Sequence, residues 1–327
     1  MKSLSVVVIG RNEEARIAEC LRSVITAAAQ VGVAEIVMVD SASDDRTVEI
    51  ARSCGVRVVS LKSDSNVSAS AGRFVGFHKT QGDLVMFVDG DTVINREWFS
   101  SAIPYFAEDH IAGVMGDLND LDAQGMELPY VGPRNEKATS CPWFRGIGMY
   151  RRSAMNEVGT FNPYLKEEEE AELAFRLTRQ GWQLLSVPEK MGSHLRGTSP
   201  LGYLLRRFNH RGFMLIGQTL RYAVYAGNGT EFIFRRCRRA INFAVAALAL
   251  VAGTTFALMG HRSAAAVMFV MLVIGSVAIA IKKRTLMGPI IYIADNSLIL
   301  LGLLVGFFTA KVKDPNDYPL DAADSSR

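Results

Sequence analysis

An apolar run that stops at two carboxylates is the feature of this sequence that most constrains its fold. Residues 84–88 are all apolar, and Asp89, Gly90 and Asp91 follow at once. Such a run predicts a strand that is buried on both faces of a parallel sheet. Its carboxyl end then lies at the sheet edge where open α/β folds bind ligands.

The two aspartates at that edge indicate a metal site. Asp89 and Asp91 are hard oxygen donors that repel each other unless a cation lies between them, and Gly90 lets the backbone turn sharply there. A divalent ion that also binds phosphate oxygens fits such a pair. The alternative interpretation is an ordinary turn at the end of a strand, because Asp and Gly are common turn residues.

Strands alternate with helices before this point. Apolar strand-like runs at 4–9, 35–39 and 56–59 are each followed by a segment with helical spacing, the last from Ala69 to Thr80. This alternation predicts an α/β fold with a mostly parallel sheet and right-handed crossovers.

Four blocks along this region resemble family 2 glycosyltransferases. They are residues 8–14, 39–47, 73–76 and 82–91, and they occur in the family's order. The resemblance implies a GT-A nucleotide-sugar-binding domain in which Asp91 holds a Mn²⁺ or Mg²⁺ ion that is bridged to the diphosphate. The residues that it assigns to the nucleotide sugar are Arg11, Glu13, Asp40, Arg73, Asp89 and Gly90.

The chain departs from the family pattern at three positions. Ser41 stands where the family often has a second Asp, Ala42 where it has Gly, and Phe74 where it usually has Asn. These departures affect the contacts expected with the nucleotide.

The acceptor side is expected further along the chain. Residues 117–142 lack a clear period and contain three prolines, which predicts an irregular, acceptor-facing region. Residues 144–152 then resemble the family's glycine-containing strand beneath the acceptor site, so Gly146 and Gly148 are assigned to it.

A run of glutamates supplies the predicted general base. Glutamates at a helix start are favoured by the helix dipole and are usually only solvated. However, aligning residues 169–176 with the family pattern Glu-Asp-x-Glu-Leu-x-x-x-Arg puts Glu169 and Glu170 on the Glu-Asp pair. We predict Glu170 as the base, with Glu169 as the alternative. His194 resembles a histidine that completes the metal site in some relatives, although a solitary His is often a surface or core residue.

The composition changes after the predicted catalytic domain, residues 1–198. Apolar and basic residues alternate from Leu201 to Tyr225, which favours an amphipathic helix at a membrane interface. Arg206 and Arg207 would there contact anionic headgroups or a lipid-linked phosphate acceptor. We assign residues 199–239 to this interface.

Two to three transmembrane helices are predicted in residues 240–311. The apolar stretches are 241–259, 264–281 and 286–310, and each approaches the roughly 20 residues that cross a bilayer as helix. The basic residues that flank them predict a multi-pass protein of the inner or plasma membrane with a cytoplasmic catalytic domain. The polar tail at 312–327 is expected to be disordered.

These patterns together predict an inverting glycosyltransferase in cell-surface glycan synthesis. Its donor would be a nucleotide diphosphate sugar and its acceptor lipid-linked. A formal net charge of only +3 gives no reason to expect nucleic acid as a partner. A nucleotidyltransferase and a non-catalytic membrane scaffold with a transferase-like domain are the alternatives, and the oligomeric state stays open.

Overall fold

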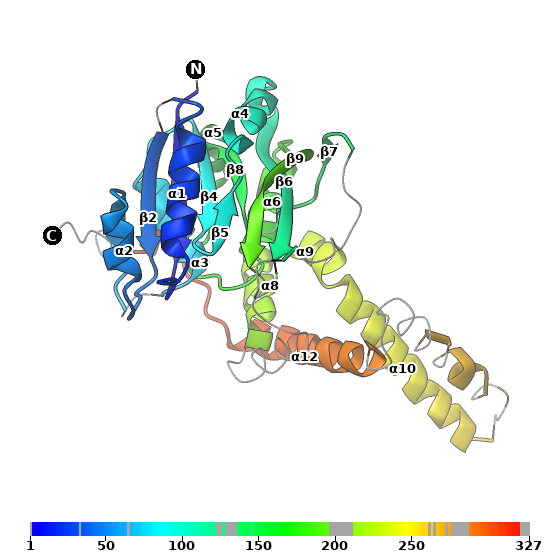
Figure 1. Cartoon of the computed structure of the whole chain (residues 1–327). Helices are drawn as coiled ribbons and strands as arrows, with labels where there is room; N and C mark the ends of the chain where they lie inside the picture. The colour runs from blue at the N-terminus through cyan, green and yellow to red at the C-terminus, as the bar shows by residue number, and fades with distance from the viewer. Residues whose placement is uncertain are drawn as a thin grey trace. The chain divides into compact units, whose positions relative to one another are not determined.

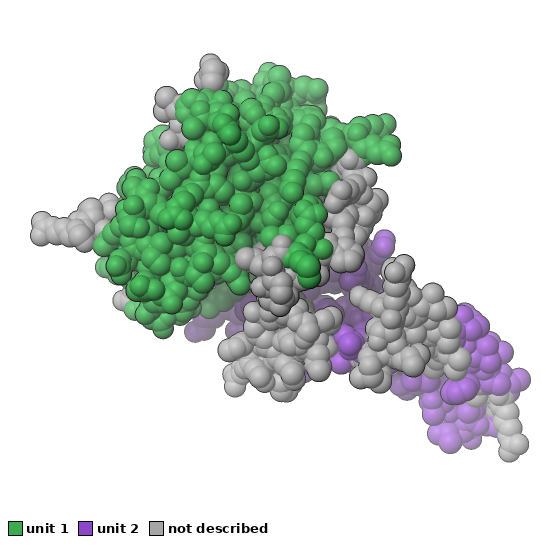
Figure 2. All heavy atoms as spheres, viewed as in Figure 1, with its two compact units in different colours: residues 1–197, 313–327 green, residues 198–312 purple. Residues whose placement is uncertain are grey.

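The computed structural model of the protein divides into two compact units (Figure 2). The first unit contains residues 1–197 and 313–327, and the second contains residues 198–312. The structure describes residues 2–32, 34–63, 66–121, 126–127, 136–144, 146–195, 212–260, 263, 266–271, 274–275 and 288–320.

The first half of the first unit alternates strands with helices (Figure 1). In order, the elements are β1 (Leu4–Gly10), α1 (Ile17–Ala28), β2 (Ala34–Asp40), α2 (Thr47–Ser53), β3 (Arg57–Ser60), α3 (Ala69–His78) and β4 (Leu84–Asp89). Strand β1 pairs in parallel with β2 and β4, and β2 pairs in parallel with β3. The helices supply the crossovers that parallel neighbours need.

The second half extends the same sheet. It contains β5 (Thr92–Ile94), α4 (Trp98–Ala102), η1 (Ile103–Ala107), β6 (Ile111–Leu121), β7 (Thr139–Ser140), β8 (Gly148–Arg151), α5 (Arg152–Val158), α6 (Glu169–Arg179) and β9 (Gln183–Leu195). The strand order is β3-β2-β1-β4-β8-β6-β9-β5, with β7 beside β9. Strand β8 is antiparallel to both β4 and β6, so the sheet is mixed. The predicted α/β class is confirmed.

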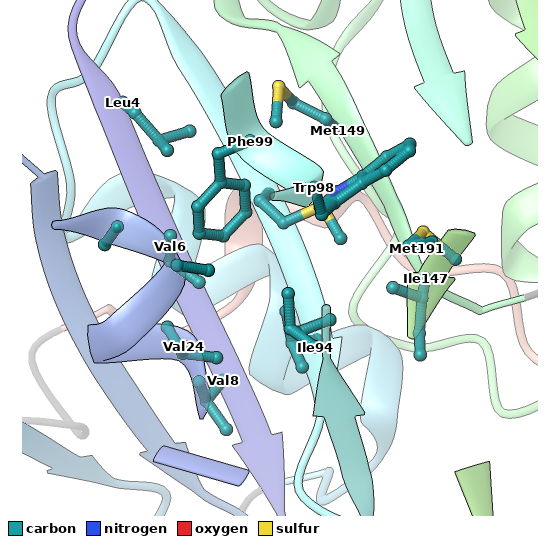
Figure 3. Packing of buried hydrophobic residues seen from close by; sticks show 14 of the residues in the cluster. Leu4, Val6, Val8, Val24, Ile94, Trp98, Phe99, Ile147, Met149 and Met191 are labelled. Atoms are coloured by element: carbon teal, nitrogen blue, oxygen red, sulfur yellow. The ribbon is translucent and has the colours of Figure 1, made fainter. Parts of the chain in front are cut away.

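Both faces of the sheet are buried. In β4, Met86 and Val88 belong to one hydrophobic cluster, and Val85 and Phe87 belong to the other. This alternation follows from the period of two along a strand. Helix α1 covers the first cluster, part of which is drawn in Figure 3, and α3 covers the second. The continuous apolar run therefore behaves as the sequence predicts.

The region expected to be irregular is partly regular. Residues Asp117–Leu121 continue β6 and pair with β9, so the prediction of an irregular segment is wrong for them. Their alternation is weak because the strand is only partly buried there. Residues 122–125 and 128–135 lie outside the part of the chain that the structure describes.

Residues 313–320, which we call the C-terminal strap, belong to the first unit. They contain η3 (Pro315–Asp317), and the Tyr318 side chain that follows is buried. The Tyr318 hydroxyl donates to the Asn66 carbonyl oxygen at 3.0 Å, and the Tyr318 ring packs edge-on against Phe74 and Tyr164. The expectation of a disordered tail is therefore wrong for residues 313–320.

The second unit is helical where it is described. Its elements are η2 (Gly212–Met214), α8 (Leu215–Tyr225), α9 (Gly229–Arg236), α10 (Arg238–Leu258) and α12 (Gly288–Thr309). Gly302 and Gly306 of α12 lie against residues 213–217 so closely that an added Cβ would overlap that backbone. This is the small-residue spacing that lets two helix backbones approach.

Two of the predicted membrane stretches form long apolar helices. Residues Arg238–Leu258 and Ile291–Thr309 are long and apolar enough to cross a membrane, by length and composition alone. Most of the stretch 264–281, and all of 201–211 with Arg206 and Arg207, lie outside the described residues.

We predict that Gly76→Ala destabilises the first unit. Helix α3 crosses β1 at Gly76, where an added Cβ would overlap Val7 and come within 3.2 Å of Val39 Cγ2. Alanine gains about 1 kcal/mol in a helix, but overpacking costs about 1–3 kcal/mol, so a net loss is expected. Thermal unfolding measures it. Ser53→Ala at an exposed helix end is the control, and an unfolding temperature for Gly76→Ala at or above that of the unmutated protein would contradict the prediction.

Candidate active site

Three parallel strands end at the same edge of the sheet. Gly10 pairs with Asp40, and Ile9 pairs with Asp89, so the ends of β1, β2 and β4 lie side by side. The Gly90 amide donates to the Ile9 carbonyl oxygen at 2.7 Å, and an added Cβ at Gly90 would lie 3.2 Å from that oxygen. Glycine avoids this crowding where the chain turns close to β1, and the turn leaves a carboxylate on each side of Gly90.

Arg73 is the buried centre of this edge. Its side chain is 3% exposed, and its guanidinium donates to Asp89 Oδ1 at 3.1 Å and to Glu169 Oε1 at 2.9 Å. Glu170 Oε1 lies 3.1 Å from Arg73 Nη1, and the guanidinium also lies over the Phe161 ring at 5.5 Å. Arg73 therefore joins α3, β4 and α6 at one point.

The cluster around Arg73 carries excess negative charge. Burial works against the Arg73 charge, but the nearby carboxylates of Glu170, Asp89 and Glu169 raise the pKa of Arg73, so it stays protonated. Burial, followed by the charge of Glu169, raises the pKa of Glu170, while Arg73 acts in the opposite direction. One guanidinium among three carboxylates leaves a site that favours a further cation.

A second pair lies on the other side of Gly90. Strands β5 and β9 pair Thr92 with His194, which brings His194 Nε2 to 3.2 Å from Asp91 Oδ2. On β6, Asp120 lies opposite His194, and its Oδ1 is 3.4 Å from His194 Nδ1. Two of the three predicted metal residues, Asp91 and His194, are therefore adjacent. Among the described residues, no three acidic, histidine or cysteine side chains gather closely enough to hold a metal by themselves.

Asp120 is a site residue that the sequence did not indicate. It falls in the stretch predicted to be irregular, and only the pairing of β6 with β9 brings it to His194. No sequence pattern near Asp120 predicts the register between β6 and the distant strand β9.

The pKa values of the pair shift in opposite directions. The hydrogen bond to Asp91 is the largest cause that raises the pKa of His194, against burial. Burial opposes the charge of Asp91, but the hydrogen bond from His194 and the positive charge of its ring lower the pKa of Asp91. Without a metal, the two therefore form an ion pair over a wide pH range.

Hydrogen bonds join the loops that follow β1 and β2. The Asn12 amide donates to Ser43 Oγ at 2.9 Å, and the Asp44 amide donates to Asn12 Oδ1 at 3.0 Å. Asn12 and Ala42 both adopt a left-handed backbone with φ of 58°. Asn tolerates this conformation, whereas Ala is strained in it, which explains why glycine suits position 42 in relatives.

The remaining predicted nucleotide residues differ in exposure. Asp40 is buried, and both of its carboxylate oxygens accept from the Ser43 amide. Burial, then the charge of Asp91, raises the pKa of half-buried Glu13. Arg11 is exposed at the loop surface.

The two predicted acceptor glycines have different surroundings. Gly146 has φ of 88°, and an added Cβ there would lie 3.2 Å from Asp89 Oδ2 and 3.9 Å from Glu170 Oε1. It therefore brings a loop backbone directly onto the carboxylate cluster. Gly148 is buried in β8, where an added Cβ would overlap the Phe144 ring, so its absent side chain serves packing.

The first unit has the architecture of GT-A glycosyltransferases. The chain is similar in fold to a mannosyltransferase from Pyrobaculum calidifontis solved in complex with GDP-Man and Mn²⁺, with a TM-score of 0.63. The likeness covers 94% of this chain and 88% of that one at 15% sequence identity.

The chain belongs to glycosyl transferase family 2. The model of that family matches residues 5–168, about half of the chain, and it includes Asp40, Arg73 and the Asp89–Asp91 turn. Glu169, Glu170 and His194 lie beyond the matched residues. Membership confirms the resemblance seen in the sequence and favours glycosyl transfer over nucleotidyl transfer.

Two curated relatives share part of the sequence. A 4,4'-diaponeurosporenoate glycosyltransferase from Staphylococcus haemolyticus is 33% identical over 119 residues, 35% of this chain and 31% of that protein. An undecaprenyl-phosphate 4-deoxy-4-formamido-L-arabinose transferase from Pseudomonas aeruginosa is 38% identical over 93 residues, 27% of each chain. The chain thus spans about a third or less of the length of these two relatives.

We predict that the His194 ring titrates above the ordinary histidine pKa of about 6.5 in the metal-free protein. Asp91→Asn removes the negative partner and should return the pKa toward that value, whereas Asp109→Asn, at an exposed position away from the site, should not. Histidine-selective NMR of the chelator-treated protein measures the titration. An unmutated His194 that titrates at or below the ordinary value would contradict the observed pairing.

Proposed function

We propose that this glycosyltransferase is metal-dependent and inverting, and that it moves a sugar from a nucleotide diphosphate sugar to a lipid-linked acceptor in cell-surface glycan synthesis. The observation that carries the proposal is the contact of Arg73 with Asp89, Glu169 and Glu170 at the edge that also holds Asp91 and His194. Glycosyl transfer requires the groups that bind the donor, hold the metal and remove the acceptor proton to lie within a few ångströms of one another. This edge of the sheet carries candidate side chains for all three roles.

The donor diphosphate would bind at Asp91 with Mn²⁺ or Mg²⁺. Asp91 and His194 offer an oxygen and a nitrogen ligand 3.2 Å apart, and Asp89 adds a second carboxylate. Such ions are often held by one or two carboxylates together with substrate phosphates, so an incomplete protein ligand set fits. When bound, the ion offsets the charge that develops on the leaving diphosphate. The related mannosyltransferase structure, which contains GDP-Man and Mn²⁺, supports this part of the proposal.

Glu170 is a better candidate for the base than Glu169. The Glu170 side chain is 16% exposed and that of Glu169 is 7% exposed, so Glu170 is the more open to an acceptor. Glu169 also accepts a hydrogen bond from Arg73 at 2.9 Å, which commits one of its oxygens. A raised pKa makes Glu170 a stronger base once it is ionised.

The reaction is a single displacement. The acceptor oxygen forms a bond to C1 of the donor sugar as the bond from C1 to the diphosphate oxygen breaks, and the acceptor proton passes to the Glu170 carboxylate. The diphosphate leaves with the bonding electron pair. Inversion at C1 follows because attack and departure occur on opposite faces.

Features of the second unit support a lipid-linked acceptor. An open groove of about 770 Å³ has apolar walls that include Tyr225 and Phe308, and Arg221 and Lys311 also line it. Apolar walls next to cations suit a lipid that carries a phosphate. The name of the Pseudomonas aeruginosa relative gives undecaprenyl phosphate as its acceptor. Within the first unit, Gly146 beside the carboxylates is the proposed acceptor contact. The predicted contacts of Arg206 and Arg207 stay predictions.

Membrane anchoring with the first unit on the cytoplasmic side is part of the proposal. Helices α10 and α12 are long and apolar enough to cross. Four arginines, at 235, 236, 238 and 239, precede the apolar part of α10. Basic residues next to a span favour the cytoplasmic side.

We predict that Asp91→Asn removes most Mn²⁺-dependent binding of nucleotide sugar while the fold is retained, because one of the two ligand carboxylates loses its charge. Calorimetry of the purified protein with GDP- and UDP-sugars, with and without Mn²⁺, measures the effect. Asp109→Asn is the matched control. Unchanged affinity of Asp91→Asn in the presence of Mn²⁺ would rule out the proposed metal site.

We further predict that Glu170→Gln lowers turnover by about 10²–10⁴-fold with donor binding preserved, the usual contribution of general base catalysis. Turnover of the unmutated protein should fall as the pH drops through the raised Glu170 pKa, because the carboxylate is lost. Assays with nucleotide sugars and a polyprenyl phosphate test both points. Glu49→Gln, at an exposed position of α2, is the control, and a larger loss with Glu169→Gln would move the base to Glu169.

A further inference from the structure

Helix α3 and the segment that leads into α6 are joined at two places. The first is the active site, where Arg73 of α3 contacts Glu169 and Glu170 of α6. The second lies at the C-terminal strap, residues 313–320. Both contacts join helix α3 to the segment that leads into α6. A shift of these two elements at the strap would therefore also change their separation at the active site.

Hydrogen bonds hold the loop at 162–165 on the start of α3. Buried Ser70 donates from Oγ to the Asn162 carbonyl oxygen at 2.7 Å, and Asn66 Nδ2 donates to the Pro163 carbonyl oxygen at 2.7 Å. Phe161, which lies under Arg73, immediately precedes this loop. The loop is therefore continuous with the floor of the active site.

Tyr318 of the strap contacts both elements at once. Its ring centroid is 5.8 Å from that of Phe74, the residue after Arg73, and 5.7 Å from that of Tyr164 in the loop. Its hydroxyl donates to the Asn66 carbonyl oxygen at 3.0 Å. Lys313 adds a cation over the Tyr164 ring at 5.0 Å. With 4% of its surface exposed, Tyr318 fills the space between helix and loop.

We propose that the C-terminal strap positions the catalytic base: Tyr318 holds α3 against the 162–165 loop and so fixes Arg73 relative to Glu170. The inference rests on the proposed function of Glu170. Tyr318 does not touch the reacting groups, so it is a positioning residue. It also ties the active site to the chain that leaves α12, only a few residues before the strap.

The expected effect falls more on turnover than on donor binding. The loops after β1 and β2, which are predicted to bind the donor, are held by contacts such as those of Asn12 with Ser43 and Asp44, whereas the contacts of Tyr318 described above are with α3, Asn66 and the 162–165 loop. A displacement of the base by about 1 Å can cost about 10²-fold in rate. Loss of the strap contact should therefore lower kcat by a larger factor than it raises the donor Kd, which can change through Arg73 because that residue is itself predicted to contact the nucleotide sugar.

The test uses the full-length protein in detergent. We expect Tyr318→Ala to lower kcat by about 10- to 100-fold, and Tyr318→Leu, which keeps an apolar group in place, to lower it less. Tyr318→Phe keeps the ring and should recover most of the turnover. Tyr105→Ala is the control: Tyr105 is half-buried, its hydroxyl likewise makes a hydrogen bond, to Glu189 at 2.9 Å, and it belongs to η1, from which no residue of the carboxylate cluster described above comes.

A double-mutant cycle separates positioning from general destabilisation. In a Glu170→Gln background the base is already lost, so Tyr318→Ala should add little further loss of kcat. A residue that acts only on stability would lower both backgrounds equally. Equal losses in the two backgrounds, or an equal loss from Tyr105→Ala, would overturn the proposal.

Hydrogen exchange distinguishes failure of this inference from failure of the proposed function. Tyr318→Ala should speed amide exchange in residues 162–170 and at the start of α3, whether or not the protein transfers a sugar. Unchanged exchange there would overturn the positioning role by itself. Faster exchange with no effect of Glu170→Gln on turnover would keep the strap contact and reject Glu170 as the base.

Discussion

The buried guanidinium of Arg73 is the interaction on which the first unit's active edge depends. Removing two or more charges from water is expensive, and a buried ion cluster is retained only where its geometry is good and its hydrogen bonds are made. Here the cluster brings together α3, the end of β4 and the start of α6. Because three carboxylates share one guanidinium, the loss of Arg73 would leave the buried Glu169 and its partly exposed neighbours Asp89 and Glu170 without a compensating charge. The same imbalance makes the edge receptive to a cation.

Much of this edge could be predicted from the sequence because its signals are local. The apolar run of β4 and the Asp-Gly-Asp turn each lie within a few residues, so periodicity and residue chemistry indicate both the strand and its ligand edge. The place of Glu169 and Glu170 in the site was accessible only through the family pattern, and their contact with Arg73 was not predicted. Their distance from Arg73 in the sequence hides the contact from local reasoning.

The contacts that the sequence did not indicate depend on the register between distant strands and on a single buried aromatic side chain. Asp120 reaches His194 only because β6 runs on to Leu121 beside β9. The C-terminal strap is polar in composition, but Tyr318 holds it on the first unit by packing between Phe74 and Tyr164. No sequence pattern near position 318 predicts this contact. The average polarity of such a segment predicts that it is solvated. One buried side chain that packs closely and makes a hydrogen bond can nevertheless hold the segment in a fixed position.

The return of the strap also limits the topology of the chain between the two parts of the first unit. A polypeptide that starts and finishes on the same side of a bilayer must traverse it an even number of times. Residues 1–197 and 313–320 belong to one packed body, so in a protein anchored as we propose they share one side. Three crossings, an odd number, would put Tyr318 on the opposite side of the bilayer from residues 1–197. Under the proposed anchoring, at most two of the three apolar stretches at 241–259, 264–281 and 286–310 would therefore pass through the membrane.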